Sequence, residues 1–241
     1  VMTQATGFAY EVVVVMDQKD WKGPAGEAIK SELASSVPGL PQAEPSLKIT
    51  YVQPKDFTGL LRYVRNILVV TIDPTAYTKV SVGYENNVWA RGQVVVSLKA
   101  PNTESIVEYS KTHEKALVDF FVKVEMNRAI EQLQKEYSMV VMDNLKSDLN
   151  VMLNAPANFT YYKDTTDFFW SSNNANTGRM DLIVYTFPYT DPNTFTEEYL
   201  VAKRDSVLKA NLPGSFPGSY MQTETRAGVE YTPITLNGKY C

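Results

Sequence analysis

Residues 8–16 read FAYEVVVVM, and this stretch decides the fold. Its four consecutive valines are β-branched and apolar, which is typical of a buried strand. The segment that follows, residues 25–35, places Ala28, Ile29 and Leu33 on one face of a helix. A buried strand followed by an amphipathic helix indicates a layered protein built from both kinds of element.

One long helical pattern separates two groups of strands. Residues 103–153 carry apolar side chains at steps of three and four, but an unbroken helix of that length would extend about 75 Å. A compact globule of this size is only about 45 Å across, so we predict a break between residues 137 and 150, where Ser138, Asp143 or Asn144 can cap a new helix. Strands are predicted over residues 47–52, 66–72, 77–84, 92–99, 159–163, 167–171, 179–188, 219–225 and 230–236, and helices over residues 54–64 and 196–210.

These elements predict an α+β fold, with mixed, mainly antiparallel sheets, helices packed on one face and a long central helix. The three strands within residues 66–99 are joined by short links and are expected to pair antiparallel. We predict an N-terminal region of residues 1–153, which includes the long helix, and a smaller C-terminal region of residues 154–241. Whether the two regions share one core or have a core each is left open.

Composition narrows the classes of function. The 241 residues are 44% hydrophobic and 21% charged, which is ordinary for a globular protein. The 23 Lys and Arg against 27 Asp and Glu give a formal charge of −4 without a basic stripe, so nucleic acid is not an expected partner. The longest apolar runs fall far short of the roughly 18 residues that suggest a membrane-spanning helix. The single cysteine, Cys241, cannot form an intrachain disulfide.

No motif of a known catalytic type is present. The sequence contains no glycine-rich nucleotide loop, HExxH, CxxC or GxSxG motif. His113 lies between Tyr109 and Leu117 on the apolar stripe of the long helix, so we expect a buried packing histidine rather than a general base. With one histidine and one cysteine, the usual ligands of zinc are almost absent. We therefore predict no catalytic residue, no cofactor and no metal ligand.

Aromatic residues supply the first candidate binding site. Tyr161, Tyr162 and Trp170 lie in the C-terminal strands, close to the polar loop SSNNANTG of residues 171–178. An exposed aromatic face at this place would suit stacking on a sugar or a peptide. A sheet covered on both faces would instead make the same rings part of the core.

Trp89 and Arg91 form a second candidate binding site. Together with Gln93 they are spaced so that all three can share one face. Arg91 either recognises a carboxylate or phosphate of a ligand, or holds Glu44 or Asp56 in place, and we favour the structural role.

Four short motifs carry a resemblance to a known family. They are YEVVVV at residues 10–15, with Trp21 and Gly26 after it, LPQAEP at residues 40–45, RNI at residues 65–67, and WARGQVVV at residues 89–96. Together they resemble a family of uncharacterised Bacteroidetes proteins, mostly predicted lipoproteins, known as a domain of unknown function. The resemblance spans most of the chain.

Two residue pairs fit the same family less specifically, namely Glu125 with Arg128 and Arg204 with Asp205. Glu125 and Arg128 are also spaced for an intrahelical ion pair. The resemblance implies export, a lipid anchor on a cysteine upstream of Val1, and a place in the cell envelope that faces the periplasm or the outer surface. It also implies related chains that continue past Cys241. No catalytic residue follows from it, because the family brings no established activity.

The sequence thus supports two hypotheses about function. The first is a non-enzymatic binding or assembly module of the bacterial cell envelope, with a glycan, a peptide or a protein as partner and with membrane contact only through the lipid anchor. The alternative is a hydrolase of glycan or peptidoglycan that uses two carboxylates about 5 to 9.5 Å apart, one of them with a raised pKa. An exposed groove or aromatic patch favours the first hypothesis, and a carboxylate pair in a cleft favours the second.

Overall fold

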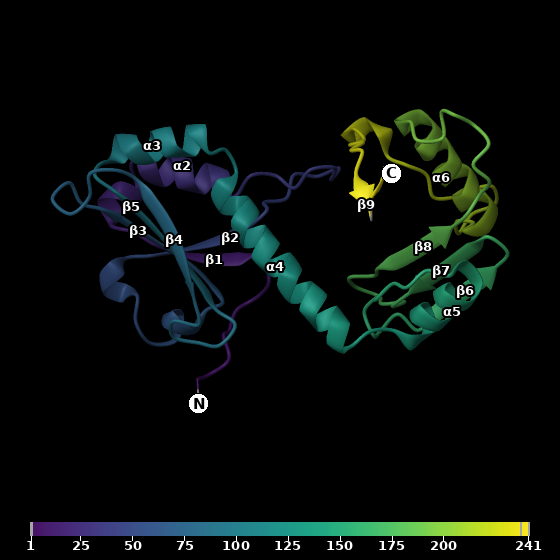
Figure 1. The fold of residues 1–241 in the computed structure, drawn as a ribbon, viewed down its shortest axis with the longest axis horizontal. Coiled ribbons are helices and arrows are strands. Elements are labelled where there is room, and N and C mark those ends of the chain that lie inside the picture. Colours follow the sequence, from purple (N-terminus) through teal and green to yellow (C-terminus); the bar gives the residue numbers. More distant parts are fainter. Residues whose placement is uncertain (1, 237, 241) are drawn as a thin grey trace. The chain divides into compact units, whose positions relative to one another are not determined.

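The computed structural model describes residues 2–236 and 238–240, so Cys241 lies outside the described residues. The chain divides into an N-terminal unit, Val1–Val37 with Gln42–Arg128, and a C-terminal unit, Ala129–Cys241 with Pro38–Pro41. A mixed sheet forms the first unit and an antiparallel sheet lies in the second. The predicted α+β fold is therefore confirmed (Figure 1).

A five-stranded sheet with the strand order β2-β1-β3-β5-β4 is the centre of the N-terminal unit. Its strands are β1 (Glu11–Val15), β2 (Lys48–Val52), β3 (Asn66–Ile72), β4 (Ser81–Asn86) and β5 (Val94–Ala100). The first four strands in this order run parallel, and β4 pairs antiparallel with β5 at the edge. The antiparallel prediction holds for β4 and β5 but is wrong for β3, because β4 lies outside β5 and leaves β3 to pair parallel with it.

The valines of β1 fill both faces of this sheet. Val12 and Val14 join the core on one face, and Val13 and Val15 join the core on the other, because successive side chains of a strand point in opposite directions. Helices α2 and α3 lie side by side on the first face (Figure 1). The helical elements of this unit are α1 (Gln18–Trp21), α2 (Pro24–Leu33), η1 (Pro54–Asp56), η2 (Gly59–Tyr63), α3 (Thr103–Thr112) and the start of α4 (Ala116–Lys135).

The long helical pattern is interrupted twice. The first break separates α3 from α4, where Lys115 adopts a left-handed conformation with φ of 62°. This break was not predicted, because no glycine, proline or asparagine marks it. The second separates α4 from α5 (Met139–Leu149), and there Ser138 caps α5 by accepting a hydrogen bond from the backbone N–H of Val141. The predicted break is confirmed, and of the three residues named as possible caps Ser138 serves, whereas Asp143 and Asn144 lie inside α5.

A three-stranded antiparallel sheet with the order β6-β7-β8 organises the C-terminal unit. Its core lies on one face, where Val141 and Leu145 of α5 pack against Phe159 and Phe169. The elements of this unit after α5 are β6 (Tyr161–Thr165), β7 (Phe168–Ser172), β8 (Asp181–Tyr185), α6 (Glu197–Asn211), η3 (Thr225–Ala227), β9 (Thr235–Leu236) and β10 (Lys239–Tyr240). The other face of the sheet carries the candidate site described next.

Candidate functional site

The register of the C-terminal sheet separates the predicted aromatic residues. Trp170 lies opposite Lys163 of β6, and Tyr161 is two positions from Lys163, so Tyr161 and Trp170 share one face of the sheet. Tyr162 lies on the opposite face, where its ring stacks on Phe169 with centroids 6.3 Å apart. Tyr161 and Tyr162 are 54% and 52% exposed. The structure thus brings two of the three residues together and separates the third.

A pocket of about 520 Å³, here called the Trp170 pocket, opens on the face that carries Trp170. The Trp170 indole N–H donates to Oδ1 of Asp181 at 2.9 Å. Arg179 donates to both oxygens of the same carboxylate, from Nε to Oδ2 and from Nη2 to Oδ1, each at 3.0 Å. The remaining lining comes from β8 and the loop after α6, and consists of Ile183, Leu212, Pro213, Gly214, Ser215 and Met221.

Asp181 is held in its ionised form. Burial by itself raises the pKa of Asp181, but hydrogen bonds from Arg179, Trp170 and Ser172, together with the charge of Arg179, bring that pKa below its ordinary value. The same carboxylate raises the pKa of Arg179. The pair is therefore neutral as a whole, and it presents a carboxylate and a guanidinium in fixed orientation beside an indole ring.

The wall formed by residues 212–221 is shaped by its own contacts. The backbone N–H of Gly214 donates to the carbonyl of Ser219 at 2.7 Å, and Ser219 Oγ donates to the carbonyl of Phe216. A Cβ atom at Gly214 would lie 2.3 Å from Ser219 Oγ, so only glycine permits this close approach. The pocket wall is thus preformed rather than assembled by a ligand.

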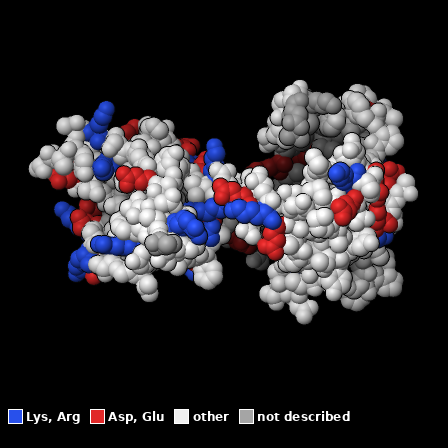
Figure 2. All heavy atoms as spheres, turned by 60° about the horizontal axis from the view of Figure 1, so that its bottom comes forward, with Lys and Arg blue, Asp and Glu red and all other residues white. Residues whose placement is uncertain are grey.

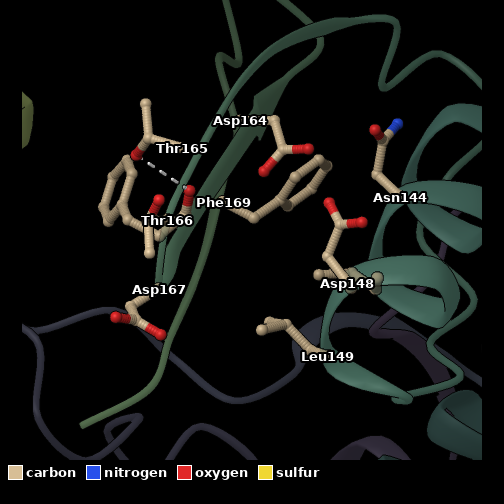
Figure 3. Close-up of a pocket in the computed structure, with 10 residues that line it drawn as sticks. Asn144, Asp148, Leu149, Asp164, Thr165, Thr166, Asp167 and Phe169 are labelled. Atoms are coloured by element: carbon tan, nitrogen blue, oxygen red, sulfur yellow. Dashed lines mark hydrogen bonds between the residues drawn. The ribbon is translucent and has the colours of Figure 1, made fainter.

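A second pocket, of about 420 Å³, lies between α5 and the turn from β6 to β7. We call it the Asp148 pocket. Asp148 comes from α5 and Asp164 from β6, and Figure 3 shows their carboxyl groups pointing toward one another. Its lining residues are Asn144, Leu145, Asp148, Leu149, Asp164, Thr165, Thr166, Asp167, Phe168 and Phe169.

The two carboxyl groups of this pocket differ in acidity. A hydrogen bond from Ser147 and the interaction with Asp164 lower the pKa of Asp148, whereas the interaction with Asp148 and then burial raise the pKa of Asp164. Both side chains are exposed to solvent. The two acids face one another across the pocket, so each affects the protonation of the other.

Trp89 and Arg91 have different surroundings. The ring of Trp89 packs against the core on the face of the sheet opposite to α2 and α3. Arg91 is exposed, and its Nε donates to Oε1 of Gln4 at 3.1 Å rather than to Glu44 or Asp56. The N-terminal segment pairs with residue 91 through an isolated β-bridge, and this contact fixes the partner of the arginine. Ligand binding by Trp89 and Arg91 stays a prediction.

The ion pair predicted between Glu125 and Arg128 is confirmed and belongs to a larger buried cluster. The Glu125 side chain is 2% exposed, and its oxygens lie 2.6 Å from Arg128 Nη1 and 2.9 Å from Arg65 Nη2. The side-chain amide of Asn66 donates to Glu125 at 2.8 Å and accepts from Arg128 at 2.7 Å. Arg128 also donates to the carbonyl of Gly92 at 2.8 Å.

Two of the motifs noted in the sequence meet in this cluster. Arg65 and Asn66 belong to RNI, and Gly92 belongs to WARGQVVV. Because their polar groups bond to Glu125 and Arg128, the motifs fasten the start of β3 and the residues before β5 to helix α4. The cluster thus gives Arg65, Asn66 and Gly92 of these motifs a structural role.

His113 occupies the C-terminal end of α3 and is exposed. Its ring stacks on Tyr109 with centroids 4.2 Å apart, and Thr112 Oγ1 lies 2.9 Å from its Nδ1. The prediction of a buried histidine is wrong, because α3 ends here and the chain turns at Lys115 instead of continuing the apolar stripe.

The surface and the described side chains add three observations. Figure 2 shows Lys and Arg interspersed with Asp and Glu over the drawn face of the N-terminal unit. Within residues 2–236 and 238–240, no three His, Cys, Asp or Glu side chains gather as a metal-binding group. None of the helices described in this part of the chain is long and apolar enough to cross a membrane.

Two family models match the chain, and both are described as domains of unknown function. DUF8532 matches residues 5–134 and DUF4837 matches residues 138–241. The two matches meet at the break between α4 and α5. Neither the curated proteins nor the solved structures gave a significant match.

Proposed function

We propose that this chain, which belongs to the DUF8532 family, is a binding module whose ligand site is the Trp170 pocket. The observation that carries this proposal is the convergence of the Trp170 indole N–H and the Arg179 guanidinium on the carboxylate of Asp181. These groups lie in a preformed pocket with a largely apolar wall, which is the usual make-up of a small-molecule site.

The ligand class that best fits this pocket is a saccharide. Because Asp181 and Arg179 neutralise one another, a charged ligand would have to separate them, whereas a hydroxyl group can donate to the carboxylate and accept from the guanidinium. The half-buried indole ring of Trp170 and the side chains of Ile183 and Met221 provide apolar surface for the carbon face of a sugar ring.

The setting that we propose is the bacterial cell envelope, where the ligand would be a glycan of that compartment and the chain a lipid-anchored protein. Support for this setting comes from the sequence motifs alone, which resemble those of Bacteroidetes proteins that are mostly predicted lipoproteins. In this setting the module binds without catalysis, and the membrane is contacted only through an anchor upstream of Val1.

Calorimetric titration of the full chain with soluble peptidoglycan fragments and envelope oligosaccharides tests the binding proposal. Saturable binding is expected, and Trp170→Ala and Arg179→Ala should each weaken it about tenfold or more, since each removes a group of the pocket. Tyr189→Ala is the matched control, because Tyr189 is an aromatic residue of the same unit, is 65% exposed and does not line the pocket. Binding that is equally strong in all three variants would contradict the assignment.

Hydrolysis at the Asp148 pocket is the second candidate function. It is favoured by the opposite pKa shifts of Asp148 and Asp164, since a pair of acids with pKa values pushed apart is the usual arrangement of an acid and a base. Because each carboxyl group shifts the pKa of the other, they would act as a proton-sharing pair and not as the independent acid and base of a glycosidase. Turnover of envelope glycans or peptides that is lost in both Asp148→Asn and Asp164→Asn would support this candidate, and the absence of turnover would remove it.

A further inference from the structure

The edge strand β4 leaves one side of the five-stranded sheet open. All six residues of β4 are exposed, and the strand pairs only with β5, on its inner side. No backbone hydrogen bond from the described residues reaches its outer side. The opposite edge strand, β2, also pairs on its inner side only, but it is less exposed, and the ring of its Tyr51 stacks on Trp21 with ring centroids 4.7 Å apart.

We propose that β4 pairs antiparallel with β4 of a second copy of this chain, about a two-fold axis at Val82. This pairing would join two five-stranded sheets edge to edge. It would satisfy the outer backbone N–H and C=O groups of both strands, which is the usual route by which an open sheet edge recruits another strand.

The apolar side chains of β4 support the choice of register. Val82 and Tyr84 lie opposite Leu98 and Val96 of β5, so they share the face of the sheet that carries the helices. They are 40% and 59% exposed. With Val82 facing its own copy, the half-buried Val80, which precedes β4, comes opposite the exposed Tyr84 of the second strand, and the apolar groups of both copies meet in one cluster.

Charge complementarity fixes the same register independently. Lys79 and Glu85 lie three residues before and three residues after Val82, so the two-fold axis places each opposite the other in the second copy. Two ion pairs form by symmetry, one at each end of the paired segment. A slip of two residues in either direction removes both pairs. Neither side chain forms an ion pair with another described residue.

The other face of β4 carries small side chains at the centre of this register. Ser81 would lie opposite Gly83 of the second copy, and a Cβ atom at Gly83 would meet no atom within 4 Å. Small side chains at both positions let the two backbones reach hydrogen-bonding distance. A second copy therefore fits this edge in length, shape and charge.

Sedimentation equilibrium of the full chain over a range of concentrations tests the proposal. A reversible monomer–dimer equilibrium is expected. Lys79→Glu and Glu85→Lys should each raise the dissociation constant about tenfold or more, since each replaces two attractive pairs by two repulsive ones. The double variant K79E/E85K recreates both pairs with exchanged signs and should restore dimerisation to within about threefold.

Two further variants keep the test decisive. Val82→Lys places two ammonium groups together at the axis and should abolish the dimer, while circular dichroism verifies that the variant is folded. Lys55→Glu is the matched control, because Lys55 is an exposed lysine of η1 that lies outside β4. A chain that stays monomeric at every concentration overturns the proposal. So does a dimer that all of these substitutions leave unchanged, since it would use another surface.

Discussion

The carboxylate of Glu125 holds two guanidinium groups in a place that little water reaches. Replacement by alanine leaves Arg65 and Arg128, which are 26% and 20% exposed, without their counter-charge. We expect Glu125→Ala to lower the free energy of unfolding by about 3 kcal/mol, at the low end for a buried pair because both arginines retain some contact with water. Urea denaturation followed by circular dichroism measures this loss.

Glu27→Ala is the control for that measurement. Glu27 and Lys30 have the same spacing on a helix, but the Glu27 side chain is 67% exposed. Exposed pairs of this kind contribute little, so the loss should stay below about 0.5 kcal/mol. Equal losses in the two variants would show that burial of Glu125 is not the cause.

Glu32 gives the N-terminal unit a pH dependence. Its Oε1 accepts the backbone N–H of Leu117 at 2.7 Å, which caps α4 from helix α2. Burial raises the pKa of Glu32 above its ordinary value of 4.5, and this outweighs the hydrogen bonds from Leu117 and Val118, which lower it. For a raised pKa, the stabilising contribution is complete below the unfolded-state value and is lost as the pH rises through the folded-state value.

Glu32→Gln removes this titration but keeps an oxygen that can cap α4. The stability of the variant relative to the unsubstituted chain should therefore increase between pH 4 and pH 7. Urea denaturation of both proteins at the two pH values measures the change. A difference in stability that is the same at both pH values would contradict the prediction.

The start of helix α5 depends on the hydroxyl group of one residue. Ser138 Oγ accepts from the N–H of Val141 at 3.2 Å and donates to the carbonyl of Phe159 at 2.6 Å. Ser138→Ala should lower the free energy of unfolding by about 1 to 2 kcal/mol, since it removes a helix cap and leaves a buried carbonyl without its donor. Ser147→Ala, at an exposed position of the same helix, should change it by less than about 0.5 kcal/mol. Urea denaturation measures both.

The sequence predicted some boundaries and pairings of the elements correctly and others wrongly, and both outcomes have physical reasons. Ser138 was predictable because a serine side chain satisfies the free N–H groups at a helix start whatever the rest of the fold. The break at Lys115 was not, since a lysine in a left-handed conformation leaves no local signal. The parallel pairing of β3 with β5 depends on where β4 settles, and that is decided by contacts distant in the sequence.

The candidate site was also predicted only in part, because its residues are brought together by strand pairing. Trp170 was predicted from the density of aromatic residues, but its partners Arg179 and Asp181 were missed. They meet Trp170 only because β7 and β8 pair in a particular register, which one sequence does not reveal. The spacing of Arg179 and Asp181 on alternate positions was the one available signal, because such residues share a face of a strand.

At the scale of the whole molecule, each unit has its own hydrophobic core, and the cores have no residue in common. We therefore expect two unfolding transitions rather than one. Of the three tryptophans, Trp21 and Trp89 report on the N-terminal unit and Trp170 on the C-terminal unit. In single-tryptophan variants, Ser138→Ala should shift only the transition seen through Trp170. A common shift in all variants would indicate one cooperative unit.

The two margins of the five-stranded sheet differ in exposure, and only the margin formed by β4 takes part in the proposed dimer. Every residue of β4 is exposed to water, whereas β2 begins with Lys48 and the ring of its Tyr51 is covered by Trp21. A contact about a two-fold axis uses the same surface on both molecules, so this surface is fully occupied once two molecules have paired. The dimer proposed at β4 would therefore be closed at that edge, and any growth into a fibre would have to start from the margin formed by β2.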